Sequence, residues 1–486
     1  MLAAYGFFLF LTNPRVTVFE DEAKYIAAAH RSAGEILASF TAGGRGDFAH
    51  PPLPDLLLHG WLRSTGGALP LLRVPSIVLY CLALWLLAET AYLRWDRRWT
   101  AVWLGVAWPA GFLLGRPAGW YALAALALAA MHWSSVRWRL TRDNWALAAL
   151  TLSAALLVHT SYFGWVFVAA TGIELAAGGA ERRHRLQLAA AAALVAAAFA
   201  PLVPAVLGRA PTEIRGYGNP ASLLARTLYL AYSLLPGELA APWTWPGVVA
   251  ALAGLALVWL SLRTPESRRA LLAVAAPFAI AAAAGLLAGA RLILFVPGAL
   301  LFLASTIAHA RARLPALLAG VTFAMGWLGI LTRAYPATHR YTEPWPRVAA
   351  EVVSRSRPGD VILASHPSFY FYLGEMFPSD VSRRMAHVPA PHRTAGRTFA
   401  PIHLWREAVD APSDQIVYVR STLMPLEGRS ETNFLAYAEG NLRLVSRSRF
   451  ARDPGAALKR RFFPDTFQPE WRIEIQVWSS EPRTVR

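Results

Sequence analysis

The chain has 486 residues, of which 55% are hydrophobic and only 16% are charged, and its mean hydropathy is +0.36. A soluble protein of this length rarely has such a composition, whereas a polytopic membrane protein does. The formal net charge is +17, but the arginines are spread between apolar runs, which argues against a nucleic-acid partner. Cys81 is the single cysteine, so an intrachain disulfide and a cysteine-based metal site are excluded.

Long apolar segments follow one another through the first two thirds of the chain. About 20 apolar residues cross a bilayer core as a helix, so each segment is a predicted spanning helix. A shorter run, MLAAYGFFLFL, opens the chain with about 11 residues, too few to cross, and we expect upstream in-frame codons to encode the rest of that helix. The long segments lie near residues 68–93, 99–115, 117–135, 144–160, 162–178, 186–208, 243–262, 270–288, 291–308 and 314–332.

Arginines are concentrated in every second loop between these segments. Cytoplasmic loops carry an excess of basic residues. The alternation therefore predicts about eleven spanning helices, with the N-terminus inside. It puts residues 12–67, residues 209–242 and everything after 333 on the external side. The arginines of the cytoplasmic loops are Arg94, Arg97 and Arg98, then Arg137, Arg139 and Arg142, then Arg182, Arg183 and Arg185, then Arg263, Arg268 and Arg269, and finally Arg311 and Arg313.

The external parts of the chain predict further elements. Residues 21–40 repeat apolar positions near helical spacing and predict an interfacial helix. HPPLPDLLLHGWL (50–62) predicts a second one, with prolines at its start, where a missing N–H costs nothing. Near the C-terminus, WPRVAAEVVSRSRPGDVILASHP predicts a helix, a Pro-Gly turn and a buried strand, while DQIVYVRS and WRIEIQVW predict further strands.

We therefore predict two domains. Residues 1–334 form a polytopic α-helical membrane domain, with external interfacial helices within 21–64. Residues 335–486 form a small external soluble α/β domain.

The chain's densest acidic cluster, Glu20, Asp21 and Glu22, follows the first apolar run directly. By itself it is typical of an acidic start to the helix at 21–40, which the helix dipole favours.

Several stretches, in this order, resemble the GT-C superfamily of membrane glycosyltransferases. The most similar branch is the dolichyl-phosphate-mannose protein mannosyltransferase-like group, which includes bacterial glycosyltransferase family 39, aminoarabinose transferases and rhizobial lipopolysaccharide transferases. At GRPAGWYAL the chain departs from the pattern, because relatives often carry an arginine where it has Gly119. The matching stretches are DEAKYIAAA, HPPLPDLLLHGWL, LLRVPSIVL, HTSYFGWVF (159–167), ARLILFVPGALLFLA (290–304) and RPGDVILAS (357–365).

The resemblance implies transfer of a sugar from a polyprenyl-phosphate donor to an acceptor hydroxyl on the external face, with inversion. Asp21 is then the general base, and Glu22 orients it or pairs with an arginine. The departing lipid phosphate needs cationic stabilisation. The candidates for that role are Arg73, Arg291, Arg116 and His50. As alternatives, the two helix-starting arginines Arg73 and Arg291 are snorkelling interfacial residues, and the histidine is structural.

The expected partners are the lipid-linked sugar, a glycan, lipid or protein acceptor, and membrane lipid. No cofactor is expected. Asp55 and His59 share a helical face, but two ligands do not make a metal site, so a divalent metal stays an open question. The expected location is the bacterial inner membrane. Two other functions stay open: a polytopic transporter of lipid or a small molecule, and a non-catalytic scaffold for envelope assembly.

Overall fold

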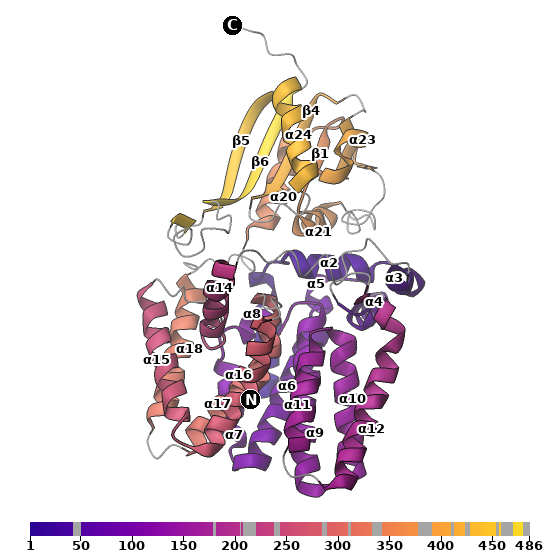
Figure 1. The fold of residues 1–486 in the computed structure, drawn as a ribbon. Helices are drawn as coiled ribbons and strands as arrows, with labels where there is room; N and C mark the ends of the chain where they lie inside the picture. The colour runs from indigo at the N-terminus through magenta and orange to yellow at the C-terminus, as the bar shows by residue number, and fades with distance from the viewer. Residues whose placement is uncertain are drawn as a thin grey trace. The chain divides into compact units, whose positions relative to one another are not determined.

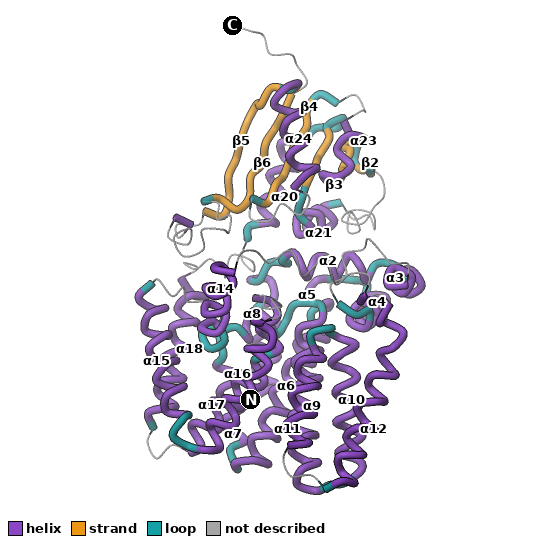
Figure 2. The backbone as a smooth tube through the Cα atoms, in the orientation of Figure 1, coloured by secondary structure: helices purple, strands orange, loops and turns teal. Residues whose placement is uncertain are grey.

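The computed structural model describes residues 1–41, 50–177, 181–204, 206–207, 220–237, 244–283, 289–309, 313–332, 343–377, 391–409, 413–422, 428–452, 456–457 and 470–479. Internal contacts divide the chain into two compact units. We call Met1–Pro14 with Ser32–Thr338 the helical unit, and Arg15–Arg31 with His339–Arg486 the sheet unit. Figures 1 and 2 show helices throughout the first unit and strands only in the second.

The helical unit confirms the predicted polytopic helical fold, since each predicted segment contains a helix. Two helices, α10 and α18, have the predicted bounds. The principal helices are α1 (Leu2–Leu11), α6 (Val74–Trp95), α7 (Arg98–Ala107), α8 (Gly111–Leu114), α9 (Trp120–Thr141), α10 (Asn144–Thr160), α11 (Gly164–Ala177), α12 (Arg182–Phe199), α14 (Pro220–Ser233), α15 (Trp245–Ser261), α16 (Pro265–Ala283), α17 (Val296–His309) and α18 (Leu314–Thr332), with the 3-10 helix η4 (Gly289–Leu294) before α17.

Not every apolar segment is one long helix. In the described part of the chain, length and composition qualify three helical stretches to cross a membrane: Leu69–Trp95, Arg182–Leu202 and Leu314–Thr332. The segment predicted at 99–115 is divided into α7 and α8. Pro109 explains the break, because proline lacks an N–H and disfavours a helical conformation in the residue before it. Trp108 is accordingly extended, with φ −63° and ψ 116°.

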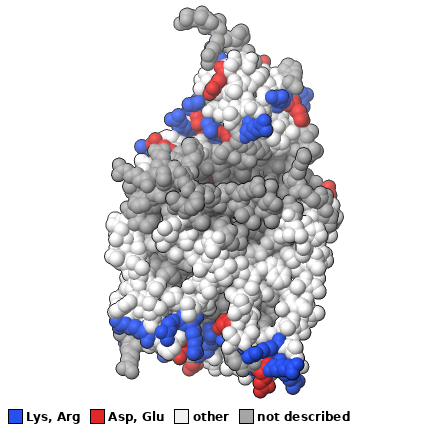
Figure 3. All heavy atoms as spheres, viewed as in Figure 1, with Lys and Arg blue, Asp and Glu red and all other residues white. Residues whose placement is uncertain are grey.

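The helices of this unit pack through small residues. The buried side of α9 includes Ala122, Ala124, Ala127 and Ala129, all fully buried. Small side chains let helix backbones approach closely, as is common between spanning helices. We call the end at which α6 and α9 begin the outer end, and the arginine-rich end at which they finish the inner end. Figure 3 shows basic side chains gathered at the inner end.

The segment between α1 and α6 forms four short helices: α2 (Glu20–Ala29), α3 (Ala33–Thr41), α4 (Leu53–Thr65) and α5 (Leu69–Leu72). The single helix predicted over 21–40 is wrong, because the chain breaks between α2 and α3. The Ser32 N–H and hydroxyl both donate to the Glu35 carboxylate, at 2.7 and 2.8 Å, and the Glu35 N–H donates back to the Ser32 hydroxyl at 3.2 Å. This reciprocal capping box starts a new helix. Helix α4 corresponds to the second predicted helix.

The sheet unit confirms the predicted α/β domain. Its mixed sheet has the order β2-β3-β1-β4-β6-β5, with β1 parallel to both β3 and β4. By contacts, residues 15–31 group with this unit, whereas the sequence placed them in the first domain. The strands are β1 (Val361–Ala364), β2 (His392–Thr394), β3 (Arg397–Pro401), β4 (Gln415–Ser421), β5 (Arg443–Arg452) and β6 (Trp471–Ser479), and the helices include α20 (Trp345–Arg355), α21 (Pro367–Met376), α23 (Trp405–Val409) and α24 (Gly428–Asn441).

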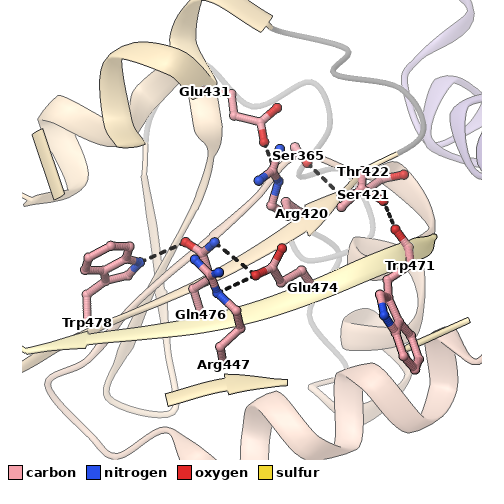
Figure 4. A network of polar contacts seen from close by, with 10 residues as sticks. All are labelled: Ser365, Arg420, Ser421, Thr422, Glu431, Arg447, Trp471, Glu474, Gln476 and Trp478. Carbon is pink, nitrogen blue, oxygen red and sulfur yellow. Dashed lines mark hydrogen bonds and ion pairs between the residues drawn. The ribbon is translucent and has the colours of Figure 1, made fainter. Parts of the chain in front are cut away.

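Apolar side chains cover both faces of the sheet, and polar networks tie its strands together. One core cluster contains Trp345 and Phe369, and the other contains Trp405 and Phe434. Ion pairs join Arg447 of β5 to Glu474 of β6 at 2.6 Å and Arg420 of β4 to Glu431 of α24 at 2.8 Å (Figure 4).

A buried ion pair gives a stability prediction for this unit. Arg472 Nη1 lies 3.3 Å from Glu343 Oε1, both side chains are buried, and the Trp345 indole N–H donates to Glu343 Oε2 at 2.7 Å. Removing one partner of a buried pair typically costs about 3–5 kcal/mol, because the other charge stays desolvated. We expect Glu343→Gln to accelerate amide hydrogen exchange in β6. Arg472→Met added to it should recover part of the loss. Unchanged β6 protection in Glu343→Gln would show that this pair does not stabilise the sheet.

Candidate active site

Arg73 lies at the outer end, between α5 and α6. Its side chain is fully buried, and its Nη1 donates to the carbonyl oxygen of Asn13 at 3.1 Å. The Arg73 carbonyl accepts the Ile77 N–H at 3.1 Å, so its backbone is already part of the first turn of α6. A snorkelling arginine keeps its head group in water. The burial of Arg73 differs from that behaviour.

Arg116, in the loop between α8 and α9, is fully buried as well. Its Nη1 donates to the Thr12 hydroxyl at 3.1 Å, and its guanidinium carbon lies 4.0 Å from the centre of the Phe112 ring. Thr12 and Asn13 are consecutive residues just after α1. The structure therefore brings two predicted phosphate-binding arginines, Arg73 and Arg116, to the same short segment.

Helix α6 holds the loop that carries Arg116. The Ser76 hydroxyl donates to the Pro117 carbonyl at 2.8 Å. A Cβ on Gly115 would come within 2.5 Å of the Tyr80 ring, so only glycine permits this approach. Gly119, which ends the loop, has φ +148°, a value that L side chains rarely adopt. An arginine at that position would be strained, which gives a physical reason for the chain's departure from the family pattern.

His50 reaches the same neighbourhood. Its ring stacks on Trp120, the first residue of α9, with the ring centres 4.5 Å apart and the planes 27° apart. Arg291 belongs to η4, which contacts α9, but its side chain lies outside the described residues.

The acidic cluster forms the first turn of α2. Phe19 is its N-cap and provides no side-chain hydrogen bond. Glu22 is fully buried and Asp21 is half-buried. Carboxylates at a helix N-terminus are stabilised by the helix dipole, so this position agrees with the structural interpretation and leaves the catalytic one a prediction.

The sheet unit anchors this acidic turn. The Val18 N–H donates to the Tyr372 hydroxyl of α21 at 2.8 Å, and α2 packs against α21. Tyr370, on the same helix, donates to the carbonyl oxygens of Ala364 and Ala400 at 2.7 and 3.0 Å, at the ends of β1 and β3. The sheet therefore fixes α21, and α21 holds the residues just before Asp21.

Other candidate residues have structural surroundings. Asp55 is buried in α4 and His59 lies one turn further on, but the described residues contain no group of three or more potential metal ligands. The Ser365 hydroxyl accepts the Ser421 N–H at 3.3 Å (Figure 4), and His366 caps α21 while stacking on a tryptophan. This pair lies at a buried strand end.

The arrangement has the chemistry that favours an anion. Two buried guanidinium groups, which contact the adjacent residues Thr12 and Asn13, lie in a low-dielectric environment, where charge-assisted hydrogen bonds to phosphate are strong. The sequence did not indicate the contacts of Thr12, Asn13 and Trp120 in the helical unit or that of Tyr372 in the sheet unit, because each contact joins residues that are far apart in the chain.

Comparison with known proteins supports the fold. No family model and no curated protein matches the chain by sequence. Among solved structures, the crystal structure of ArnT from Cupriavidus metallidurans bound to undecaprenyl phosphate matches 98% of this chain and 97% of that chain, with a TM-score of 0.57 and 12% sequence identity. The chain thus shares the fold of that protein, a mostly helical, polytopic unit with a C-terminal mixed-sheet domain.

The anchor of the acidic turn can be tested without an activity assay. Tyr372→Phe removes the hydroxyl that accepts the Val18 N–H and leaves the ring in place. A single hydrogen bond contributes about 0.5–1.5 kcal/mol, so we expect the Val18 amide to exchange with solvent several-fold faster. Tyr370→Phe is the matched control, because it loosens β1 and β3 instead. Equal Val18 exchange in wild type and Tyr372→Phe would mean that the hydroxyl does not hold this segment.

Proposed function

We propose that this chain is a membrane glycosyltransferase that moves a sugar from a polyprenyl-phosphate donor to an acceptor hydroxyl on the external face. The observation that carries the proposal is the meeting of Arg73 and Arg116 at Thr12 and Asn13. It occurs in a fold shared with a protein that was crystallised with undecaprenyl phosphate. The membrane we propose is the bacterial inner membrane.

In this mechanism the acceptor oxygen attacks the anomeric carbon of the sugar from the face opposite the phosphate. The new C–O bond forms as the bond from carbon to phosphate oxygen breaks, so the configuration inverts. The polyprenyl phosphate leaves with the electron pair of the broken bond. Arg73 and Arg116 stabilise its growing negative charge, which lowers the barrier without a proton donor. Arg291 and His50 are further candidates for contact with the donor phosphate.

The acceptor hydroxyl must lose its proton as it attacks. We assign that proton to Asp21, acting as general base, and we assign Glu22 the role of orienting Asp21. Support comes from the family resemblance of DEAKYIAAA and from the firm anchoring of the preceding residues on α21. Seven residues lie in the sequence between Asn13, which Arg73 contacts, and Asp21.

The phosphate role predicts a graded response to arginine substitution. We expect Arg73→Ala and Arg116→Ala each to lower transfer about 10- to 150-fold, since a hydrogen bond to a charged group contributes about 1.5–3 kcal/mol. Lysine should restore little, because it lacks the forked donor geometry. The measurement is transfer from a polyprenyl-phosphate sugar in nanodiscs, with the melting temperature of each variant as a check on folding.

Arg63→Ala is the matched control for this series. Arg63 lies in the last turn of α4 with an exposed side chain, so its loss should leave transfer unchanged. Wild-type transfer in Arg73→Lys and Arg116→Lys would reduce both arginines to a structural role.

The base role predicts a different pattern. Asp21→Asn is nearly isosteric but cannot accept the proton, so kcat should fall about 10²–10⁴-fold while donor affinity stays close to wild type. Glu22→Gln should reduce kcat less. A merely structural acid at the helix start would cost about 1 kcal/mol of stability and spare kcat. If Asp21→Asn keeps wild-type turnover and Glu22→Gln loses it, the base is Glu22. If both keep it, the acidic turn is only a helix start.

A further inference from the structure

A cavity of about 290 Å³ lies at the inner end of the helical unit, at the opposite end of α6 and α9 from the proposed donor site. Three arginines line it: Arg94 near the end of α6, Arg139 near the end of α9, and Arg269 near the start of α16. Helices that are far apart in sequence thus direct three guanidinium groups to one space. Leu93, Val136 and other apolar side chains complete the lining, so the cavity is amphipathic.

The arginines of this cavity are partly held in place. Arg139 Nη2 lies 2.8 Å from Glu174 Oε1 of α11, and the Arg94 guanidinium carbon lies 5.4 Å from the centre of the Trp95 ring. A narrow space adjoins the cavity, and Arg94, Arg139, Glu174 and His132 all line it. Ordered arginines lose less side-chain entropy when they bind a ligand.

The charges in this cluster do not balance. Two carboxylates, those of Glu174 and Glu266, accompany the three guanidinium groups in the lining of the cavity and its adjoining space. One positive charge therefore remains uncompensated in the cluster. A phosphodiester carries a single negative charge at neutral pH and would balance it. Guanidinium groups also match phosphate oxygens in geometry.

The surroundings place this end of the unit at a membrane interface. Arg263 lies over Trp259 with 3.7 Å between guanidinium carbon and ring centre, and the Trp259 side chain is exposed. Tryptophan and basic residues concentrate where a spanning helix meets the lipid headgroups. A ligand that enters from this layer would bring a charged head and an apolar tail, as the cavity lining requires.

We propose that the cavity lined by Arg94, Arg139 and Arg269 binds the phosphodiester headgroup of an anionic phospholipid from the leaflet at the inner end. Such a lipid would sit between α6, α9 and α16 and tie their inner ends together. The proposal is independent of the proposed glycosyl transfer, because it uses none of the residues assigned to that reaction.

The test is lipid binding to the purified full chain in detergent, followed by native mass spectrometry with short-chain phosphatidylglycerol. We expect Arg94→Gln and Arg269→Gln each to weaken binding about tenfold or more, the effect of losing one charge-assisted contact. Arg263→Gln is the matched control, since Arg263 lies at the same end outside the cavity lining, and it should bind as wild type does. The Arg269 side chain is exposed, so its replacement should leave folding intact, which the melting temperature checks.

Three outcomes would overturn the proposal. Wild-type affinity in both Arg94→Gln and Arg269→Gln would show that the cavity is not the binding site. An equal loss in Arg263→Gln would mean that lipid is attracted only by the general charge of this end. Displacement of the lipid by an equal concentration of inorganic phosphate would make the cavity a site for a soluble anion. Phosphatidylcholine, which has the same phosphodiester but no net charge, should bind more weakly.

Discussion

Two fully buried guanidinium groups, those of Arg73 and Arg116, set the constraint on which the outer end of the helical unit depends. A buried charge is costly unless hydrogen-bond partners surround it. Thr12 and Asn13 provide such partners and so must lie beside the start of α6 and the loop before α9. The close approach of Gly115 to α6 serves the same requirement. The ends of three helices are therefore fixed by the burial of two charges.

The acidic turn depends on a different part of the chain. The chain leaves the helical unit after Pro14, contributes α2 to the sheet unit, and returns at Ser32. The Ser32–Glu35 capping box starts a fresh helix at that return. The position of Asp21 within the sheet unit is thus governed by the sheet through α21.

The sequence predicted a structural feature where neighbouring residues carried the signal for it, and failed where the feature depended on residues far apart in the chain. Apolar runs predicted the helices, and the Pro-Gly turn before β1 was predicted from its own residues. The break at Ser32 also had a local signal, the S-x-x-E pattern, which the apolar periodicity of 21–40 outweighed. Strand β5 was missed because it is an edge strand of alternating exposed and half-buried positions with many arginines. The hydrogen bond from Val18 to Tyr372 spans 354 positions, and no local pattern predicts such a contact.

Arginine side chains have different surroundings at the two ends of the helical unit. At the inner end the arginines are mostly exposed or paired with aromatic rings, as expected of residues that orient a membrane protein. At the outer end, Arg73 and Arg116 are buried and donate hydrogen bonds to other parts of the chain. Residue type alone cannot separate an exposed, orienting arginine from a buried one, because both lie at or near the ends of helices. Burial distinguishes the two kinds of arginine, because a desolvated guanidinium is stable only where a specific partner or ligand offsets the free energy of desolvation. The arginines of the inner cavity combine features of both groups. They are accessible, but they extend from three helices into one space. The fold, and not the local sequence, brings them together.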